Sequence, residues 1–511
     1  MDLKNKRIAK NTVFLVIRTI VSLIITLYTT RIVLKELGVD DYGVFSLIYG
    51  VVALFTFINT SMNESVQRYF SIYYGKKEYT SLGGFFKSSI VLYILIGLFF
   101  LSVMLLIRNL VVFDFLNIPE SKRYIACDIY TIAVIGILFS VLQTPFNSLV
   151  LAAEEMSFYA YVSIFESLLK LLASLSIGFI AIDKLYSYTL LLLSCSGIVF
   201  FTYLFFSIFK FKDIIFTGKS SSSKIKELFY FSFWNILGNF STVLRIQGVN
   251  VLINLFFSTT ANAAYAVSNS INGALNSLSN SLNIAIKPQI YKAYAANDSD
   301  RYIQLVVNGS KLTFTFLFFL CLPIFINLDG ILKIWLVEPP KYTYFLTLII
   351  LSVSLVDSFS FPLMAALQAT GRIRLYQLIV SSITIASVPA IYLLYYLGFS
   401  IYSLGIVLMS SSVATLFVRI FLLNKMTSLS QAVIYKRAVF PCLIGAIISG
   451  GVVHLYGLFV ESKGFLGIVL SSFFIDAICL LVFYFIIFDK TEKILVNKFV
   501  LHYFNKLSRN S

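Results

Sequence analysis

Five asparagines recur along one face of a segment that is apolar enough to lie in a membrane. Asn269, Asn272, Asn276, Asn280 and Asn283 fall within an arc of about 80° if each residue advances by 100° around a helix. Hydrocarbon offers no hydrogen-bond partner to an amide, so this stripe must face protein or a water-filled cavity. Because each amide both donates and accepts hydrogen bonds, the stripe is a candidate binding surface for a polar ligand.

A second polar stripe lies roughly 220 residues earlier, within another apolar segment. It includes Tyr49, Asn59, Asn63 and Gln67, whose spacing places them on a shared helical face. Two polar-faced membrane helices at equivalent places in two halves of a chain predict a central hydrophilic pathway. Such a pathway is typical of a transporter.

Cationic residues inside predicted membrane segments are the next candidates. Arg18 and Arg245 lie in the first and seventh predicted spans. A cation at bilayer depth costs on the order of 2.5–3.5 kcal/mol, so it faces a cavity, reaches the membrane surface or pairs with an acid. Lys170 follows Glu166 by four residues, so it either neutralises that acid or joins a cationic cavity.

Three acids within predicted spans are candidates for coupling to a proton or a sodium ion. They are Asp128, Glu166 and Asp357. The sequence leaves open whether each acid binds an ion or pairs with a neighbouring arginine. Arg68 and Arg419 lie near helix ends, where a long side chain is expected to reach the membrane surface.

No motif predicts an enzyme, a metal site or a cofactor. The sequence contains no HExxH, no GxSxG, no P-loop and no cluster of Cys and His. The five cysteines lie inside predicted spans without a CxxC pair, which favours packing as small apolar residues.

The composition establishes the fold class as an all-α polytopic membrane protein. Of 511 residues, 59% are hydrophobic and only 13% are charged. Apolar runs of 18 or more residues predict spanning helices. Fourteen are predicted, at about 11–34, 43–69, 88–107, 124–150, 158–182, 187–209, 228–256, 263–286, 309–328, 342–369, 376–397, 400–423, 439–460 and 466–488.

The placement of basic residues predicts the orientation. The N-terminus, the C-terminus and the loops after even-numbered spans hold 25 Lys and Arg, whereas the loops after odd-numbered spans hold 8. The positive-inside rule therefore places both termini in the cytoplasm. The net charge of +16 is explained by this topology and by contact with anionic lipid, so no nucleic-acid partner is expected.

Two internal matches indicate that the chain repeats itself. Gln67 corresponds to Gln289 in one match, and Pro145 to Pro362 in the other. Both have an offset of roughly 217–222 residues, so spans one to six correspond to spans seven to twelve. Since six is even, the two six-helix repeats are parallel, and two C-terminal helices lie outside them. The predicted parts are a lobe at 1–209, a cytoplasmic linker at 210–227, a lobe at 228–423, and two extra helices with a tail at 424–511.

Several stretches resemble a known family. The first 70 residues, the turn LGVDDYG at 37–43 and the later LQATGRIRLYQ at 367–377 are similar to bacterial Wzx-type polysaccharide flippases. These belong to the multidrug/oligosaccharidyl-lipid/polysaccharide exporter superfamily. The resemblance covers the whole chain, including two six-helix halves with two extra helices.

This resemblance implies that the chain moves an undecaprenyl-pyrophosphate-linked oligosaccharide from the cytoplasmic to the outer leaflet of the bacterial inner membrane. Flippases of this superfamily hold the pyrophosphate with arginines in a central cavity, for which Arg18 and Arg245 are the best matches, with Lys170 as a further cation. The two polar stripes would suit the sugar hydroxyls. Membrane lipid, a polysaccharide polymerase and glycosyltransferases are the expected partners.

Two other functions remain open at this stage. A drug or cation antiporter of the same fold would need buried acids in its cavity, where Arg18 and Arg245 would repel a cationic substrate. A membrane enzyme that processes polysaccharides would need a reactive rim or a large outward loop. The short outward loops and the scarcity of histidine argue against that enzyme.

Overall fold

The computed structural model is helical throughout the part of the chain that it describes. The described residues are 3–53, 56–116, 118, 120–179, 183–257, 259–336, 339–459, 464–487 and 493, and no strand occurs among them. The expected all-α class is therefore confirmed.

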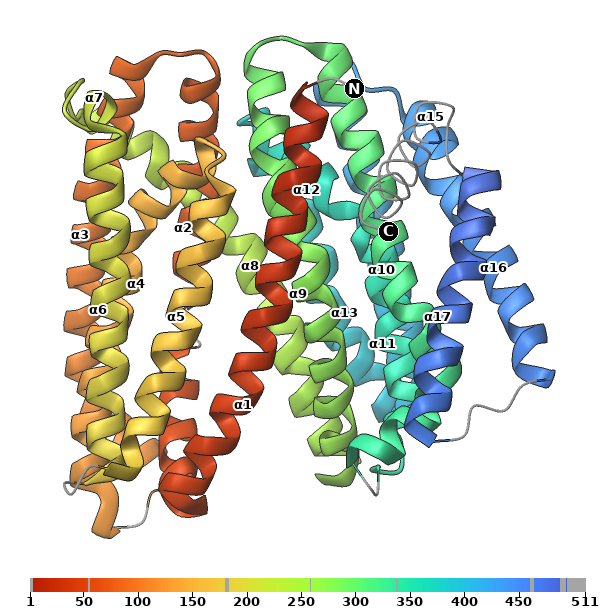
Figure 1. Cartoon of the computed structure of the whole chain (residues 1–511), viewed down its shortest axis with the longest axis horizontal. Coiled ribbons are helices and arrows are strands. Elements are labelled where there is room, and N and C mark those ends of the chain that lie inside the picture. Colours follow the sequence, from red (N-terminus) through yellow and green to blue (C-terminus); the bar gives the residue numbers. More distant parts are fainter. Residues whose placement is uncertain are drawn as a thin grey trace, which may run out of the picture.

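The helices form two bundles that lie beside each other (Figure 1). The first bundle contains α1 (Leu3–Ala53), α2 (Thr56–Gly75), α3 (Tyr79–Asn109), α4 (Arg123–Ala152), α5 (Met156–Ser176) and α6 (Lys184–Lys210). The second contains α8 (Ser222–Phe256), α9 (Thr259–Ala295), α10 (Ser299–Leu336), α11 (Thr343–Ser358), α12 (Ser360–Ala369), α13 (Arg374–Tyr396) and α14 (Leu404–Met426). The short α7 (Lys212–Ile215) joins the bundles, and α15 (Gln431–Ile434), α16 (Phe440–Phe459) and α17 (Gly464–Val482) follow the second.

Short irregular turns extend several of these helices. The π-helical turns are Leu110–Phe115, Tyr435–Val439 and Phe483–Ile487, and the 3₁₀ turns are Glu120–Lys122, Ile177–Phe179 and Ile401–Ser403. Within α1 the chain reverses direction at Gly38, whose φ of 80° lies in the region that favours glycine. The LGVDDYG turn thus separates the first membrane helix from the start of the second.

Twelve helices of the described chain are long and apolar enough to cross a membrane, compared with the fourteen predicted. The two predicted spans that are not among them are 43–69 and 263–286, which carry the polar stripes. Both segments are nevertheless helical, in the last part of α1 with α2 and in α9. The polar stripes reduce their mean hydropathy, although the 37 residues of α9 are ample to span a bilayer.

The two bundles repeat the same helix pairings. In the first bundle α1 packs against α5 and α4 against α6, and in the second α8 packs against α13 and α11 against α14. This correspondence supports two parallel six-helix repeats. Outside them, α16 and α17 pack against α10, and α1 also contacts α9 of the other bundle.

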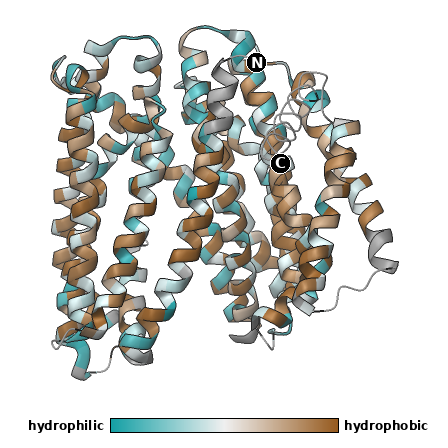
Figure 2. Ribbon diagram, in the orientation of Figure 1, coloured by the Kyte–Doolittle hydropathy of each residue, from teal (hydrophilic) through white to brown (hydrophobic). Residues whose placement is uncertain are grey.

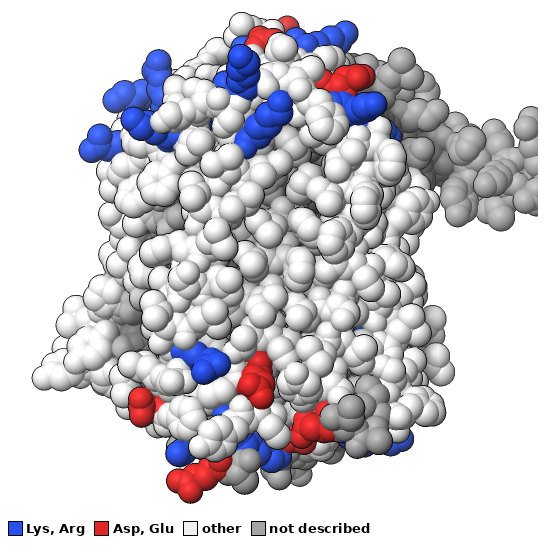
Figure 3. All heavy atoms as spheres, turned by 90° about the vertical axis from the view of Figure 1, so that its left-hand side faces the viewer, with Lys and Arg blue, Asp and Glu red and all other residues white. Residues whose placement is uncertain are grey.

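The surface has the band pattern of a membrane protein. Hydrophobic residues occupy most of each long helix, and hydrophilic residues gather toward the ends (Figure 2). On the face of the first bundle, a wide uncharged zone separates two charged rims, and the upper rim is mainly Lys and Arg (Figure 3). The number, length and composition of these helices are those of a multi-pass membrane protein.

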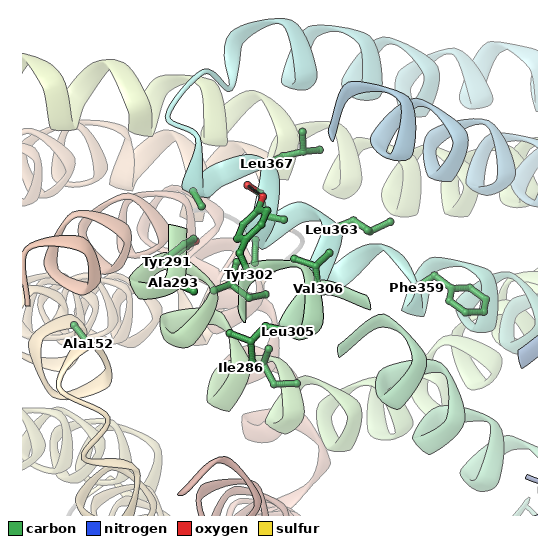
Figure 4. Packing of buried hydrophobic residues seen from close by; sticks show 14 of the residues in the cluster. Ala152, Ile286, Tyr291, Ala293, Tyr302, Leu305, Val306, Phe359, Leu363 and Leu367 are labelled. Carbon is green, nitrogen blue, oxygen red and sulfur yellow. Dashed lines mark hydrogen bonds between the residues drawn. The ribbon is translucent and has the colours of Figure 1, made fainter. Parts of the chain in front are cut away.

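Helix α12 is fixed in the core of the second bundle. The hydroxyl of Tyr291 on α9 donates a hydrogen bond of 2.8 Å to Oε1 of Gln368, and that of Tyr302 on α10 donates one of 3.1 Å to the carbonyl of Ala366. Apolar side chains from the same three helices pack around these tyrosines (Figure 4), among them Ile286, Leu305, Val306, Leu363 and Leu367. The end of α12 is therefore held rigidly against α9 and α10.

Candidate functional site

A cavity of about 610 Å³ lies between the two bundles, and we call it the central cavity. Its wall comes mainly from α2, α8, α9, α11 and α12, with one or two residues each from α4, α5, α13 and α14. The charged residues that line it are Glu64, Arg245, Lys287, Asp357 and Arg419. A cavity of this kind is what the two polar stripes predict.

The asparagine stripe of α9 faces this cavity over most of its length. Four of its members line the wall, namely Asn272, Asn276, Asn280 and Asn283. Oδ1 of Asn272 accepts hydrogen bonds from Oγ of Ser354 at 2.6 Å and from Nδ2 of Asn276 at 2.8 Å. Asn269 does not line the cavity, and its Nδ2 donates to the carbonyl of Tyr265 at 2.9 Å.

The stripe of α2 is divided between the cavity and the neighbouring helix. Asn63 and Gln67 line the central cavity, whereas Asn59 does not. Oδ1 of Asn59 accepts a hydrogen bond from Thr144 at 2.9 Å, and Oδ1 of Asn63 accepts one from Ser148 at 2.7 Å. These bonds hold α2 against α4.

Ion pairs join different helices at the wall of the central cavity. Nη2 of Arg245 lies 3.7 Å from Oδ2 of Asp357, and Nζ of Lys287 lies 3.1 Å from Oε1 of Glu64. Arg419 is the third cation of the wall. Three cations against two acids leave the described wall with an excess of one positive charge.

Arg419 does not reach the membrane surface, so the expectation from its position near a helix end is wrong. Its side chain is buried, and Nη1 donates to Oγ of Ser360 at 2.9 Å and to Oγ1 of Thr415 at 3.2 Å. Its Nε has no hydrogen-bond partner among the described residues. The helix that carries it faces the second bundle's interior, which offers hydroxyl acceptors at this depth.

A second cavity, of about 600 Å³, lies wholly within the first bundle, and we call it the N-terminal cavity. It is lined by α1, α4, α5 and α6, and includes Tyr49, Arg18, Glu166 and Lys170. The three cations expected to bind one ligand group are therefore not brought together, because Arg245 lies in the central cavity.

Arg18 differs from the other cations of the two cavities. Its guanidinium carbon lies 4.9 Å from the ring centre of Tyr159, and its Nε is buried with no hydrogen-bond partner among the described residues. In contrast, Nζ of Lys170 lies 2.6 Å from Oε1 of Glu166, an ion pair that their spacing of four residues predicts. Tyr159 lines both cavities and so marks the place where they adjoin.

The three acids considered for ion coupling have different surroundings. Glu166 is paired with Lys170 in the N-terminal cavity, and Asp357 faces Arg245 in the central cavity. Asp128 is exposed on α4 and lines neither cavity. Only the first two could couple an ion to a ligand within a cavity.

Comparisons with known proteins give the fold. The family model MatE matches residues 15–175. A MATE crystal structure in the bent conformation aligns with a TM-score of 0.72 at 12% identity, covering 83% of this chain and 96% of that chain. The outward-facing conformation of a multidrug resistance MATE family transporter of the MOP superfamily aligns with a TM-score of 0.67 at 13% identity, covering 81% and 95%.

The chain has the fold of the MATE transporters. A further structure with this fold is a MOP superfamily transporter from Pyrococcus furiosus, for which reverse polarity of the binding pocket suggests a different function. It aligns with a TM-score of 0.68 at 13% identity and covers 82% of this chain and 96% of that chain. A search of curated proteins by sequence found no match. The MATE-fold proteins matched here are transporters and not enzymes.

In this MATE fold, polar contacts join the two bundles at the end where α2, α4, α9 and α12 terminate, the upper end in Figure 1. Arg68 of α2 is only 7% exposed, and it donates to the backbone carbonyls of Gln368 at 2.6 Å and Ala369 at 2.9 Å. The expectation that Arg68 reaches the membrane surface is therefore wrong. The last carbonyls of a helix lack intrahelical partners and carry partial negative charge, so they attract this cation.

A second group of contacts lies at the same end of the MATE fold. Glu154, in the turn between α4 and α5, is 5% exposed and contacts both Lys292 and Gln289 of α9. Farther from this end, beside the central cavity, Nδ2 of Asn239 on α8 donates to Oγ of Ser61 on α2 at 2.7 Å. The bundles are therefore held together by charged and amide groups at one end of the central cavity.

Sequence reasoning did not select the ion pair of Glu64 and Lys287, although the stripes contain a signal for it. Lys287 continues the asparagine stripe one turn after Asn283, and Glu64 directly follows Asn63 within the earlier stripe. Extending the first stripe by one turn and widening the second by one residue would have placed a base and an acid on the two polar faces. Asn239 shares a helical face with Asn235 and Thr242 in the sequence, whereas Tyr159 carries no comparable signal.

Proposed function

We propose that this chain moves a lipid-linked oligosaccharide carrying a pyrophosphate across the bacterial cytoplasmic membrane by alternating access. The observation that carries this proposal is the excess of positive charge on the wall of the central cavity, together with its row of amides. Pyrophosphate is a compact polyanion, and a guanidinium group can donate two parallel hydrogen bonds to its oxygens. The resemblance of LGVDDYG and LQATGRIRLYQ to Wzx-type flippases supports the same substrate class.

The proposed pyrophosphate ligands are Arg245, Lys287 and Arg419. Arg245 is the most accessible of these to a ligand, because its contact with Asp357 is long at 3.7 Å and the pair lies at the cavity wall. A phosphate oxygen can compete with a carboxylate at that distance. Amide groups of the asparagine stripe would complete the coordination, since Nδ2 of Asn280 and Asn283 can donate to phosphate or sugar oxygens.

The orientation follows from the basic residues. Under the positive-inside rule, the Lys- and Arg-rich rim of Figure 3 faces the cytoplasm. The contacts of Arg68 and Glu154 would then close the central cavity on its cytoplasmic side. On this reading the structure represents the outward-facing state, and the lobes at 1–209 and 228–423 are the two bodies that rock.

The membrane potential can drive such transport. A negative interior favours outward movement of an anion by about 2.3 kcal/mol per charge per 100 mV, so two charges gain about 4–5 kcal/mol. Ion coupling through Asp357 or Glu166 is the other available source of energy. The glycosyltransferases that build the substrate and the polymerase that consumes it are the partners that this function implies.

A drug or cation antiporter is the second candidate. The observations that favour it are the fold shared with a multidrug resistance transporter and the two acids of the central cavity, Glu64 and Asp357. Each acid has a cationic partner in the structure, which a cationic substrate would have to displace.

One pair of variants separates the two functions. Purified protein is placed in liposomes, and both the flipping of an undecaprenyl-pyrophosphate-linked oligosaccharide and the export of a cationic dye are measured. A flippase loses flipping with Arg245→Ala and keeps it with Asp357→Asn, which frees the guanidinium. A cation antiporter shows the reverse, losing dye export with Asp357→Asn. If Arg245→Ala retains the full rate of flipping, Arg245 does not bind the pyrophosphate.

A further inference from the structure

The wall of the N-terminal cavity is rich in hydroxyl groups. They come from all four helices of the wall, mostly from α1, α5 and α6, and surround one volume of about 600 Å³. Six of them are Thr26, Thr29, Thr30, Ser163, Ser167 and Ser196. Hydroxyls from several helices around a shared space form a binding surface, unlike hydroxyls scattered along one helix.

Five of these six hydroxyls bond only within their own helices, each donating to the backbone carbonyl four residues earlier over 2.7 to 3.1 Å. Oγ of Ser167 lies 3.0 Å from the carbonyl of Ser163 and 3.1 Å from Oγ of Ser22 on α1, so its one hydrogen is shared between the two. The hydroxyl oxygens therefore present acceptor lone pairs to the cavity. A ligand that satisfies this wall must bring many hydrogen-bond donors, as a sugar ring does.

Aromatic rings from α1 and α6 complete the wall. Phe45 lies with its ring centre 4.4 Å from that of Tyr49 and 5.3 Å from that of Tyr188, and all three line the cavity. Such a cluster offers an apolar surface for the C–H face of a ring, next to acceptors for its hydroxyl rim.

The net positive charge on the described wall of the N-terminal cavity favours an acidic sugar over a neutral one. Lys170 is neutralised by Glu166, whereas Arg18 forms no ion pair among the described residues and contacts the face of Tyr159. The buried Nε of Arg18 lacks an acceptor. A carboxylate on the ligand would supply one, since a guanidinium group binds carboxylates through paired hydrogen bonds.

We propose that the N-terminal cavity binds one acidic sugar residue, with the six hydroxyls accepting from its hydroxyl groups and Arg18 binding its carboxylate. This inference rests on the proposed function, in that the sugar belongs to the lipid-linked substrate whose pyrophosphate occupies the central cavity. Tyr159, which lines both cavities, lies where the two parts of the substrate would join.

Other ligands fit this wall less well. A pyrophosphate group has only acceptor oxygens, so each hydroxyl would have to give up its bond to a backbone carbonyl in order to bind it. A sodium ion would accept the hydroxyl oxygens as ligands, but the cavity holds two cations and one acid and so repels it.

The test uses full-length protein in lipid nanodiscs with a cysteine at Ser167. All five native cysteines are buried, so they should react slowly with the reagent. Labelling of the parent protein, which lacks the introduced cysteine, measures that background. The rate of reaction with a water-soluble thiosulfonate is first measured without sugar. It is then measured in the presence of an acidic disaccharide of glucuronate and N-acetylglucosamine, and in the presence of the neutral disaccharide of N-acetylglucosamine. An Asn280→Cys protein reports on the central cavity in the same way.

We expect the acidic disaccharide to protect Ser167→Cys at a concentration at least about tenfold lower than the neutral one, because Arg18 adds a charged hydrogen bond. Arg18→Gln should remove this preference and leave the weaker protection by the neutral sugar. Arg18→Lys should retain part of it. The thermal midpoints of all the variants are compared, so that a misfolded protein is recognised.

Three results would overturn the inference. One is equal potency of the two disaccharides with folded protein. Another is protection of Asn280→Cys in place of Ser167→Cys. The last is slower labelling in sodium chloride than in N-methylglucamine chloride of equal strength, which indicates a cation site. Flipping in liposomes is measured in parallel: loss of sugar protection with intact flipping overturns only this inference, whereas no flipping by the parent protein overturns the proposed function.

Discussion

Nε of Arg68 in the first bundle donates a hydrogen bond of 2.6 Å to the backbone carbonyl of Gln368 in the second. The guanidinium carbon also lies 4.8 Å from the ring centre of Tyr69 and 4.9 Å from that of Phe231. One buried side chain thus connects α2, α8 and the end of α12. For the bundles to separate at this end, these contacts must break.

The first prediction is that Arg68→Ala opens the bundles at this end. Each hydrogen bond to a charged group contributes about 1.5–3 kcal/mol, so losing them should shift the conformational equilibrium by at least about tenfold. Spin labels at Lys77→Cys, on an exposed turn, and at Ser299→Cys, at the exposed start of α10, report the separation by electron paramagnetic resonance. Arg372→Ala is the matched control, because Arg372 is exposed in the adjoining turn. An unchanged distance distribution in Arg68→Ala would contradict the prediction.

The second prediction concerns the glycine of the LQATGRIRLYQ motif. Gly371 has a φ of +76°, and a Cβ there would lie 2.6 Å from Nη2 of Arg68. Gly398 has a similar φ of +83° with nothing within 4 Å of its Cβ position. Gly398→Ala should therefore lower the free energy of unfolding by about 1–2 kcal/mol, which is the cost of a side chain at positive φ. Gly371→Ala should lower it by more, because the clash with Arg68 adds to that cost. Thermal unfolding in detergent measures both.

The Arg68→Ala background isolates the steric part of that effect. There Gly371→Ala should cost no more than Gly398→Ala, because the clashing atoms are gone. If the excess cost of Gly371→Ala persists, the contact with Arg68 is not its cause.

The sequence predicts the helices and their polar faces because both depend on periodicity. The stripe from Asn272 to Asn283 faces the central cavity, since an amide row has no other stable place in a membrane helix. The same logic fails at Asn269, which lies on the stripe but bonds to its own helix. Periodicity gives the direction of a side chain and does not say where a cavity ends.

Contacts between distant helices could not be predicted in the same way. Arg245 and Asp357 are 112 positions apart, and only packing shows that α8 and α11 bring them to 3.7 Å. The separation of Arg18 and Lys170 from Arg245 into another cavity likewise depends on how the bundles meet. The sequence does not show that Arg68 and Arg419 are buried. The partner of Arg68 is a helix terminus and the partners of Arg419 are two hydroxyls, and neither kind of partner leaves a pattern in the sequence.

The third prediction is that Glu64 and Lys287 are energetically coupled. Their side chains are 24% and 18% exposed, so removing one partner leaves a poorly hydrated charge. Glu64→Gln and Lys287→Met should each lower the thermal midpoint, and the double variant should recover part of the loss. A coupling of about 0.5–3 kcal/mol is expected from the cycle. Strictly additive single changes would mean that the pair does not act as a unit.

The last prediction separates the cavity-facing part of the asparagine stripe from the rest. Asn276 and Asn269 lie on the same helix, and Nδ2 of each donates to the carbonyl four residues earlier, at 3.0 and 2.9 Å. Only Asn276 lines the central cavity. Asn276 also donates to Oδ1 of Asn272, so Asn276→Ala should lower stability somewhat more than Asn269→Ala. Measured on equal amounts of folded protein, only Asn276→Ala should slow the flipping of a lipid-linked oligosaccharide in liposomes. Because the two residues match in type, helix and backbone bonding, a slower rate in Asn276→Ala alone identifies the cavity as the path of the substrate, and equal rates contradict it.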